Sequence, residues 1–582
     1  MQQLVFELSW YLSQVLGGDI ALSDSELQIP PKKELWDLCI WLFQFMKTYK
    51  VSPGVLCDWI TCLHKENNTS VIESLTLTGP YLNITLKKSY YWELFREFYI
   101  WKKYYNTRQK GGVAIVDYIW ANVWKPMHIG HICTPLQWQS CINVLRKIWY
   151  TVIWDSHIWD WGIIFWKLIV WYWKYWIEEK LQQDAVEHLF DIYVKISADA
   201  EKNQKLEQDF RDAFRLLSSG EQDSIDLWKK FTSSSIDTMN TLLNRLFVYP
   251  DYNIGESFYE WLNLPKLENY PDLTYSMHDI VEELIEKWIA TKNEDNSVWV
   301  LFSEYSKLSS CILQKRDGTH GYLASDLACI RYRIENWNPE RIIYFVDVRQ
   351  QLHFKQAFEI AKQAWWLWDT YLSHAHNGFI SLKEWAMSTR KWRIIKLSKL
   401  LDEAHERAKN IIVDKRGDLS DENLTHLSEI VGIWAVKYWY LKKSRELDSI
   451  FDWDDYMSFE WNSWPYLQYA YVRAKKILQN TQSDDFNNLT YKFIHPRESQ
   501  FIQKLFEYPK IVDEISKNYN VHQLCLYMYE LTKVFSAYYS DVEILRESQS
   551  NIRESRLALL SCFTEILEEW FSILWIELPD EM

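Results

Sequence analysis

The sequence predicts an α/β protein in which a parallel sheet follows an α+β domain and precedes an all-α bundle. Three observations predict this order. The continuous apolar run "VAIVDYI" (113–119), typical of a buried parallel strand, precedes a helical pattern at about 129–148. A second strand, "RIIYFVDV" (341–348), is again followed by a helical segment. Beyond about residue 395 the apolar spacing is almost wholly helical, which indicates a bundle.

The remaining segments fit between these landmarks. Residues 1–105 have a mixed α/β pattern, which ends in "LTLTGPYLNITL", a strand-like run with a Gly79-Pro80 turn. "NTRQKGG" (106–112) is a plausible linker. "YTVIW" (150–154) completes a βαβ unit with the first buried strand. Residues 177–300 are charge-rich and mostly helical, as expected of solvated amphipathic helices.

Composition excludes several classes of protein. The net charge of −15 argues against a wholly basic nucleic-acid binder, although it permits a local basic groove. The nine cysteines form no CxxC pair, so a zinc site is not expected, and unpaired thiols fit a reducing cytosol. The N-terminus lacks a basic signal-peptide region, and charged residues interrupt the aromatic stretch at 155–176, so no membrane role is expected. The chain lacks a GxGxxG fingerprint, which counts against an NAD enzyme.

Two histidines follow the first buried strand at the predicted start of a helix. His128 and His131 are three positions apart and share one helical face. A helix N-terminus attracts phosphate, and two imidazoles there could hydrogen-bond phosphate oxygens as charge develops. Gly130 between them would let a flat base approach the backbone. Two histidines at this spacing are more often structural, so the motif alone leaves both interpretations open.

Further motifs follow the two histidines along the chain. After "HIGH" (128–131) the chain carries, in sequence, "HIWDWG" (157–162), "GYLASDLACIRYR" (321–333), "VDVRQQLHF" (346–354) and "MSTRK" (387–391). This set resembles the class I aminoacyl-tRNA synthetases, and specifically the arginyl-tRNA synthetase family. The resemblance covers nearly the whole chain, from "TGPYLNI" near the N-terminus to "LWIELPDEM" at the C-terminus.

The resemblance implies a domain organisation. Residues 1–107 would form an N-terminal α+β tRNA-binding domain, and 108–415 a Rossmann-like catalytic domain whose insertion spans about 177–300. A helical stem at 416–475 and an α-helical anticodon-binding domain at 476–582 would follow.

The resemblance also implies an activity. It is the ATP-dependent activation of L-arginine and transfer to tRNA(Arg), with ATP as substrate, Mg²⁺ as cofactor and no protein-bound metal. A cytoplasmic monomer is expected. Two alternatives remain at this point: a non-catalytic tRNA-binding paralogue, and a related class I synthetase for another amino acid. The presence of all the motif residues together favours the enzyme, and the paired acids favour arginine.

Residue roles follow from the same resemblance. The arginine substrate would contact Asp117, Asn122, Tyr322, Asp326 and Gln350. A guanidinium is a planar fork of donors, and carboxylates such as Asp117 and Asp326 can accept from it bidentately. Tyr322 and Asp326, four positions apart, would share a face if that segment is helical.

The ATP-binding residues would come from two motifs. His128, Gly130 and His131 belong to the first, and Met387, Ser388 and Thr389 to the second, "AMSTRKW" (386–392). Ala386 and Thr389 stand where the family usually has lysine, so Arg390 and Lys391 would meet the phosphates. Lys125 would supply the missing cation. Together with the two histidines, these three cations are the predicted catalytic residues.

Tryptophan is unusually abundant. The chain has 34 tryptophans and 15 glycines, whereas average usage predicts about 41 glycines. Tryptophan stands where the family has glycine at positions that include 159, 166, 392, 461, 464 and 575. Overpacking typically costs about 1–3 kcal/mol per site. We therefore expect most of these positions to be glycine in the functional protein, as when a gene that uses UGA for glycine is translated by a code that reads UGA as tryptophan.

Overall fold

A computed structural model describes residues 2–22, 26–28, 37–67, 71–100, 102, 111–118, 125–161, 167–170, 172, 175, 177–200, 205–218, 220–260, 266, 269–378, 380–382, 395–415, 419–451, 464–481, 486 and 489–576. The chain divides into two compact units. The first comprises Met1–Asn106, Ala470–Pro509 and Glu530–Ile566, and the second comprises Thr107–Tyr469, Lys510–Tyr529 and Leu567–Met582. Among the helices in the described part of the chain, none is both long and apolar enough to cross a membrane.

The first unit combines a small sheet with helices. Its antiparallel sheet has the order β1-β2-β4-β3. A cluster of aromatic rings joins its C-terminal helices, in which Phe535 and Phe563 stack at 4.4 Å between centroids. The N-terminal elements of this unit, and the α19 helix, are α1 (Gln2–Leu16), β1 (Leu27–Gln28), β2 (Leu38–Trp41), α2 (Phe43–Tyr49), α3 (Pro53–Glu66), β3 (Ile72–Thr78), β4 (Tyr81–Leu86), α4 (Lys88–Ile100) and α19 (Pro496–Phe506).

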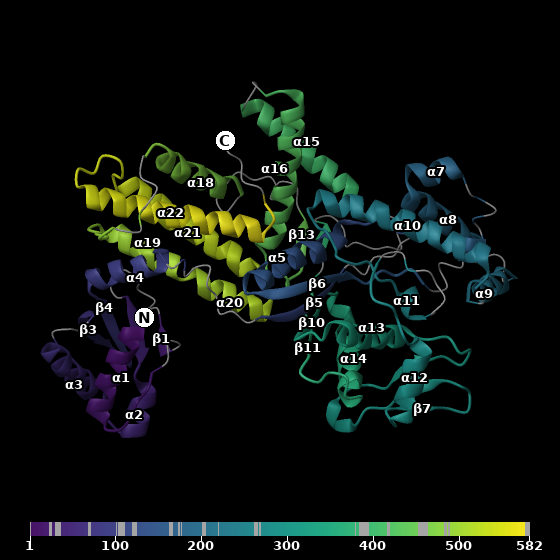
Figure 1. Ribbon diagram of the computed structural model, residues 1–582, viewed down its shortest axis with the longest axis horizontal. Coiled ribbons are helices and arrows are strands. Elements are labelled where there is room, and N and C mark those ends of the chain that lie inside the picture. The colour runs from purple at the N-terminus through teal and green to yellow at the C-terminus, as the bar shows by residue number, and fades with distance from the viewer. Residues whose placement is uncertain are drawn as a thin grey trace. The chain divides into compact units, whose positions relative to one another are not determined.

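The second unit is built on a parallel sheet of order β11-β10-β5-β6 (Figure 1). The strands are β5 (Gly112–Tyr118), β6 (Tyr150–Ser156), β10 (Arg341–Tyr344) and β11 (Tyr371–His374). Helix α5 (Cys133–Lys147) connects β5 and β6 and contacts both, so the predicted βαβ unit is confirmed. Helices α13 (Tyr322–Trp337) and α14 (Gln351–Gln363) form a buried core with Ile115 and Ile342 of the sheet.

Other elements of the second unit surround this sheet. The segment 177–300 is mostly helical as predicted, but it also contains two strands of a small antiparallel sheet, β7-β8-β9, that sequence patterning missed. Strands β12 and β13 form a separate two-stranded parallel sheet. The elements are η2 (Ile129–Ile132), α7 (Glu178–Gln183), α8 (Ala185–Ala200), α9 (Lys205–Ser218), α10 (Gln222–Arg245), α11 (Glu256–Glu260), α12 (Met277–Glu286), β7 (Ala290–Lys292), β8 (Val298–Val300), η3 (Glu304–Ser306), β9 (Cys311–Gln314), η4 (Val348–Gln350), β12 (Ile380–Leu382), α15 (Leu397–Lys415), α16 (Asp421–Leu441), β13 (Ser449–Phe451) and α20 (Tyr508–Asn518).

The remaining helices complete the predicted all-α C-terminal region. They are α18 (Trp464–Gln479), α21 (His522–Asp541) and α22 (Ser550–Ile573), and each of them contains a boundary between the two units, as α20 does. All nine cysteines are unpaired, and Cys62 on α3 is exposed while the others are buried or half-buried.

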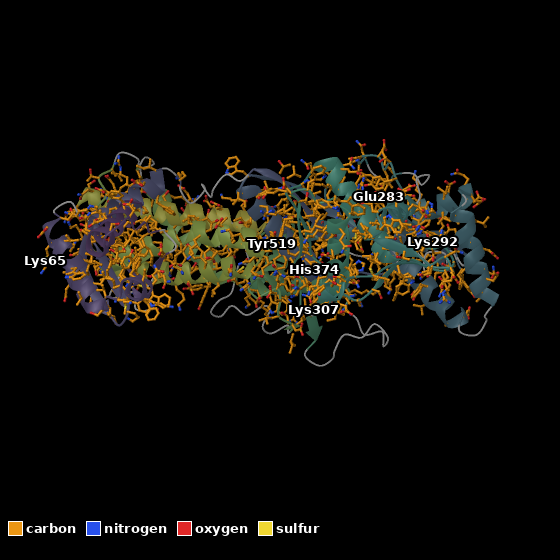
Figure 2. All side chains as sticks on the ribbon, turned by 90° about the horizontal axis from the view of Figure 1, so that it is seen from below. Lys65, Glu283, Lys292, Lys307, His374 and Tyr519 are labelled. Atoms are coloured by element: carbon orange, nitrogen blue, oxygen red, sulfur yellow. The ribbon has the colours of Figure 1, made fainter. Side chains whose placement is uncertain are left out.

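Tryptophans occupy two different kinds of backbone position. Of the twelve described non-glycine residues with positive φ, five are tryptophans: Trp149, Trp288, Trp365, Trp368 and Trp575. Trp366 differs from its neighbours because it is buried and donates from Nε1 to Glu283 Oε1 at 3.0 Å (Glu283 is labelled in Figure 2). The left-handed region disfavours side chains with a Cβ, and glycine is the residue most often found there.

Candidate active site

Two acidic side chains face each other near the carboxyl ends of β5 and β6. Asp117 and Asp155 pair in register, and both are fully buried. Arg333 of α13 bridges them, with Nη1 2.5 Å from Asp117 Oδ2 and Nη2 donating to Asp155 Oδ2 at 2.5 Å. Burial alone would lower the pKa of Arg333, but the two carboxylates raise it well above its ordinary value. Asp117, predicted to contact the arginine substrate, therefore lies in a buried ion pair within the protein.

The two predicted histidines form a compact turn after β5. The His128 side chain caps η2, and its Nδ1 accepts a hydrogen bond from the Gly130 N–H at 3.0 Å. The His131 Nδ1 accepts from the His128 N–H, also at 3.0 Å. Both Nδ1 atoms are acceptors, so each neutral ring must carry its proton on Nε2. The backbone thus fixes the tautomer of both imidazoles.

Both imidazoles are neutral at physiological pH. Burial and the nearby charge of Lys125 lower the pKa of His128 to about 4. Burial, His128 and Lys125 lower the pKa of His131 to about 3. The ring centroids lie 3.9 Å apart, which is compatible with two uncharged rings. A neutral ring with its proton on Nε2 can donate a hydrogen bond to a phosphate oxygen without taking up a second proton.

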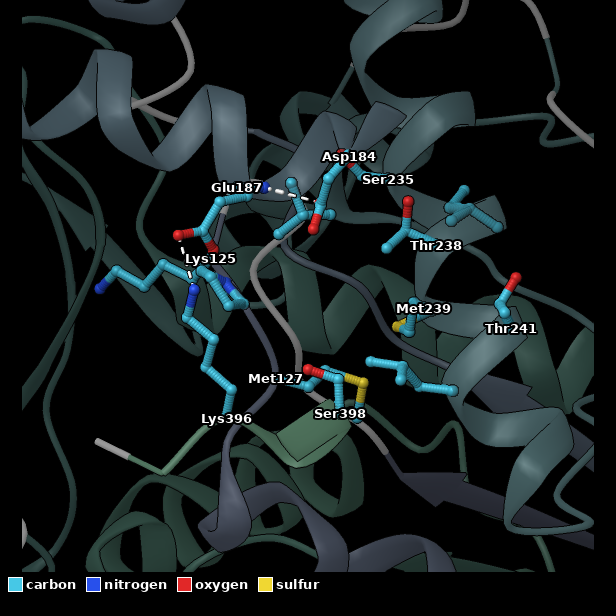
Figure 3. Close-up of a pocket in the computed structure, with 14 residues that line it drawn as sticks. Lys125, Met127, Asp184, Glu187, Ser235, Thr238, Met239, Thr241, Lys396 and Ser398 are labelled. Atoms are coloured by element: carbon cyan, nitrogen blue, oxygen red, sulfur yellow. Dashed lines mark hydrogen bonds and ion pairs between the residues drawn. The ribbon is translucent and has the colours of Figure 1, made fainter. Parts of the chain in front are cut away.

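The chain returns to this turn after the second predicted motif. The Ile129 N–H donates to the Ile395 carbonyl at 3.0 Å, and the Leu397 N–H donates to the Met127 carbonyl at 2.8 Å. A pocket of about 300 Å³ adjoins the same segment and includes Lys125 and Lys396 in its lining (Figure 3). Lys396 pairs with Glu187 at 2.6 Å across this pocket. Burial lowers the pKa of Lys125.

A second group of polar residues surrounds the first turns of α13. Tyr322 and Asp326 lie one turn apart on this helix, as predicted from their spacing. Asp326 is buried, whereas 66% of the Tyr322 surface is exposed. His353 of α14 contacts Asp326, with His353 Nε2 2.5 Å from Asp326 Oδ2. Gln350, also predicted to contact arginine, is half-buried and ends the η4 turn immediately before α14.

Sequence reasoning missed one further acidic residue. Glu256 begins α11 and is buried. Burial, followed by the charges of Asp326 and Asp160, raises its pKa well above the ordinary value. A Cβ at the preceding Gly255 would collide with the Asp160 carboxylate, so only glycine lets this turn approach. The local sequence offers only a glycine followed by a glutamate at the start of a short helix, and this pattern alone does not predict a functional residue.

Trp159 borders this acidic region. Its ring stacks on Tyr322, with centroids 5.6 Å apart and planes inclined by 18°. An indole on the face of Tyr322 occupies space beside the helix that carries Asp326. Position 159 is one of those at which the sequence predicts glycine.

Several predicted site residues lie outside the described residues, namely Asn122, Met387, Ser388, Thr389, Arg390 and Lys391. Within the described ranges, no group of three or more His, Cys, Asp or Glu side chains could hold a metal ion.

Comparisons with known proteins fit this geometry. The family described as tRNA synthetases class I (R), catalytic domain, matches residues 100–453, which is more than half of the chain. The chain belongs to the arginyl-tRNA synthetase family. The Arginyl tRNA synthetase N terminal domain matches residues 4–86, and the DALR anticodon binding domain matches 467–582. The resemblance found in the sequence motifs is thereby confirmed.

Individual members of the arginyl-tRNA synthetase family align along most of their length. The arginine–tRNA ligase of Fusobacterium nucleatum is 34% identical, over 88% of this chain and 87% of its own. That of Halothermothrix orenii is 32% identical, over 96% of this chain and 95% of its own. Arginyl-tRNA synthetase from Plasmodium falciparum has the same fold, with a TM-score of 0.78, 21% identity and coverage of 100% of this chain and 99% of its own.

Proposed function

We propose that this chain is an arginine–tRNA ligase whose two half-sites are the histidine turn and the acidic region of α13. In the first step, an arginine carboxylate oxygen attacks the α-phosphorus of ATP. The new O–P bond replaces the bond to the β-phosphate, and pyrophosphate leaves. In the second step, a terminal ribose hydroxyl of tRNA(Arg) attacks the arginyl carbonyl, and AMP leaves. The observation that carries the proposal is the pair of imidazoles whose Nδ1 atoms are both held by backbone N–H groups.

The histidine turn would bind the phosphates of ATP. Its two Nε2–H donors are oriented by the backbone before any ligand arrives, so little reorganisation is needed when charge develops on the α-phosphate. Gly130 in this turn would also lie against the nucleotide. Lys125 supplies a positive charge close to both rings. Arg390 and Lys391 would add charge from the second motif, together with binding by Met387, Ser388 and Thr389, because the segment after it is hydrogen-bonded to the first motif.

The acidic region would bind the guanidinium of arginine. Asp326 and Glu256 are buried carboxylates whose charges act on each other. A positive planar fork between them would relieve this repulsion and leave fewer buried charges unpaired. The other residues proposed to contact arginine are Tyr322, one turn before Asp326, and Gln350, Asn122 and Asp117.

Other parts of the chain would act on tRNA or on the metal that accompanies ATP. The N-terminal domain would bind the elbow of tRNA, and the C-terminal helices would bind the anticodon loop, where stacking on unpaired bases is common. Magnesium would accompany the phosphates of ATP. There it would neutralise phosphate charge. We further propose that the enzyme acts in the cytoplasm as a monomer.

Arginine-dependent exchange of pyrophosphate into ATP tests this function. We expect exchange with arginine when tRNA(Arg) is present and little exchange without it. Exchange supported by another amino acid would identify a different synthetase specificity. Binding of tRNA without any exchange would identify a non-catalytic paralogue.

A further inference from the structure

His353 and Asp326 form a buried contact that the function above does not use. Their side chains come from α14 and α13, two helices that pack together. The distance between His353 Nε2 and Asp326 Oδ2 is 2.5 Å. The Asp326 side chain is 4% exposed and that of His353 is 21% exposed, so water competes little for this hydrogen bond. We propose that His353 is a positioning residue that orients the Asp326 carboxylate and makes arginine binding depend on pH.

The orientation follows from the hydrogen-bonding capacity of a carboxylate. The imidazole donates a hydrogen bond from Nε2 to Asp326 Oδ2 in both of its protonation states, because Nε2 carries a proton when the ring is neutral and when it is charged. The plane of the carboxylate is then fixed, and Oδ1 is the oxygen that remains to meet a guanidinium N–H. This inference rests on the proposed role of Asp326 as an arginine ligand.

The pH dependence follows from the second ring nitrogen. Burial lowers the pKa of His353, but the charge of Asp326 and its hydrogen bond outweigh that effect and raise it above 6.5. Below this raised pKa, a proton on Nδ1 neutralises part of the carboxylate charge and repels the guanidinium. Arginine should therefore bind more tightly as pH rises through the pKa of His353.

The titration of His353 must be distinguished from that of the other ionisable groups around this contact. Buried Arg333 stays charged because its pKa is raised. His157 stays neutral because burial lowers its pKa to about 4. Burial and the charges of Asp326, Asp160 and Glu260 raise the pKa of Glu256 on α11 well above its ordinary value. A variant that removes only the titration of His353 distinguishes these sources.

The test compares the full-length protein with H353Q and H353A in tRNA-dependent pyrophosphate exchange between pH 6 and 8.5. For the unaltered protein we expect the KM for arginine to fall about tenfold as pH rises. H353Q keeps an N–H donor without titrating, so its KM should be flat and close to the unaltered value at pH 8.5. H353A should have a KM raised about tenfold or more at every pH, while the KM for ATP stays within about twofold in all three proteins.

Two results would overturn this role of His353. One is an H353Q variant that keeps the full pH dependence, which would show that a group other than His353 titrates. The other is an H353A variant in which the KM values for arginine and ATP rise together. A nuclear magnetic resonance titration of His353 adds a readout that needs no catalysis, because D326N should lower its pKa. Absence of arginine-dependent exchange in the unaltered protein, with tRNA binding intact, would instead reject the proposed function and this role with it.

A separate observation concerns helix ends. At the end of α12, Ile289 N–H donates to the Leu284 carbonyl at 2.9 Å and Trp288 N–H to the Ile285 carbonyl at 3.0 Å. These two bonds define a Schellman motif, whose left-handed position is usually glycine. Trp288 occupies it with φ 60°.

The same pair of bonds closes α14 around Trp365 and α22 around Trp575. At α14 the donors are Trp366 and Trp365, and the acceptors are Ala361 and Lys362. At α22 the donors are Ile576 and Trp575, and the acceptors are Phe571 and Ser572. Three helix ends with one hydrogen-bond pattern thus carry tryptophan at the glycine position, and α10 ends in the same pattern around Phe247.

Side-chain environment separates these tryptophans from others. Trp288, Trp365 and Trp368 are 94%, 87% and 89% exposed, all with positive φ. Trp366, between two of them, is 4% exposed and hydrogen-bonded. We infer that the functional protein has glycine at 288, 365, 368 and 575 and tryptophan at 366.

Thermal unfolding of single variants tests this assignment. W288G, W365G and W368G should each raise Tm by about 2–4 °C because the backbone strain is removed. W366G and W228G are matched controls, and both should lower Tm because their rings are buried and donate hydrogen bonds. Equal loss of stability in all five variants would overturn the assignment. So would peptide masses from the source cell that place tryptophan at 288, 365 and 368.

Discussion

The two halves of the proposed active site hold their polar groups by different means. On the proposed nucleotide side, His128 and His131 are fixed by hydrogen bonds to backbone atoms at most three residues away. On the proposed amino acid side, Glu256, Asp326 and His353 come from three helices that are far apart in the sequence. The nucleotide side is therefore a local structure, whereas the amino acid side exists only when the domain is packed.

The charges of the two halves also differ. The imidazoles are neutral because burial and a neighbouring lysine lower their pKa values. The acidic side concentrates buried carboxylates and balances some of them with Arg333. The comparison teaches that damage to the nucleotide side should affect chemistry, while damage to the amino acid side should affect binding and, near Arg333, folding.

The largest effect should come from removing the arginine that bridges Asp117 and Asp155. R333M should lower the free energy of unfolding by about 3–5 kcal/mol, because two buried carboxylates lose their partner. Urea denaturation measures this loss. The control R331M removes a partly exposed ion pair with Glu283 and should cost about 1 kcal/mol or less. Similar losses of unfolding free energy in both variants would show that the buried ion pair contributes no more to stability than the partly exposed one.

The next largest effect should follow from D326N. Removing the buried charge that we propose meets the guanidinium should lower kcat/KM for arginine about a thousandfold, whereas the KM for ATP should not change. Exchange kinetics with each substrate varied in turn measure both values. E335Q, on the exposed side of the same helix, is the control and should be neutral. A rise in the KM for ATP together with that for arginine would contradict the separate roles proposed for the two halves.

H131N should affect the chemical step rather than arginine binding. An asparagine oxygen can replace Nδ1 as acceptor for the His128 N–H, but the Nε2–H donor is lost. We expect kcat for adenylate formation to fall about a hundredfold with an almost unchanged KM for arginine, as measured by rapid quench. H426N, at an exposed histidine of α16, is the control. A loss confined to the KM for arginine would assign His131 to the wrong half.

Stability should fall as the solution becomes acidic. The pKa of His131 is about 3 in the folded protein, compared with about 6.5 in an unfolded chain. Between these values only the unfolded chain takes up the proton, so stability is lost as pH falls from about 6.5 toward 3. His131 should contribute about 2 kcal/mol of this loss between pH 7 and 5. Denaturation at both pH values should show a smaller difference in H131N, and an unchanged difference would contradict the lowered pKa of His131.

The smallest effect should come from opening the face of Tyr322. W159G removes the indole stacked there and should lower the KM for arginine about tenfold, or about 1.4 kcal/mol. W59G, at an exposed tryptophan of α3, should leave the KM unchanged. An increase in the KM for arginine in W159G would show that the indole is part of the binding surface.

Sequence patterns predicted the local features of this molecule well. The buried run 113–119 became β5, and the histidine spacing became a capped turn, because both depend on neighbouring residues. The spacing of Tyr322 and Asp326 correctly placed them on one helical face. The substrate roles of these residues stay predictions.

Features that depend on packing were not predicted. The strands β7, β8 and β9 are only three or four residues long, which is too short for a periodic signal. Glu256 and His353 gain their importance from contacts across the domain. Glu256 has no distinctive local pattern, and the motif that contains His353 does not reveal its contact with Asp326. The pairing of Asp117 with Arg333 joins residues more than 200 positions apart, which spacing cannot reveal.

The single exposed thiol makes the N-terminal unit accessible to site-specific chemistry. Cys62 is on the surface of α3, whereas the other eight thiols are buried or half-buried. A maleimide fluorophore should react first at this position, remote in sequence from every residue assigned to catalysis. The labelled protein would then report tRNA docking by fluorescence without any engineered cysteine.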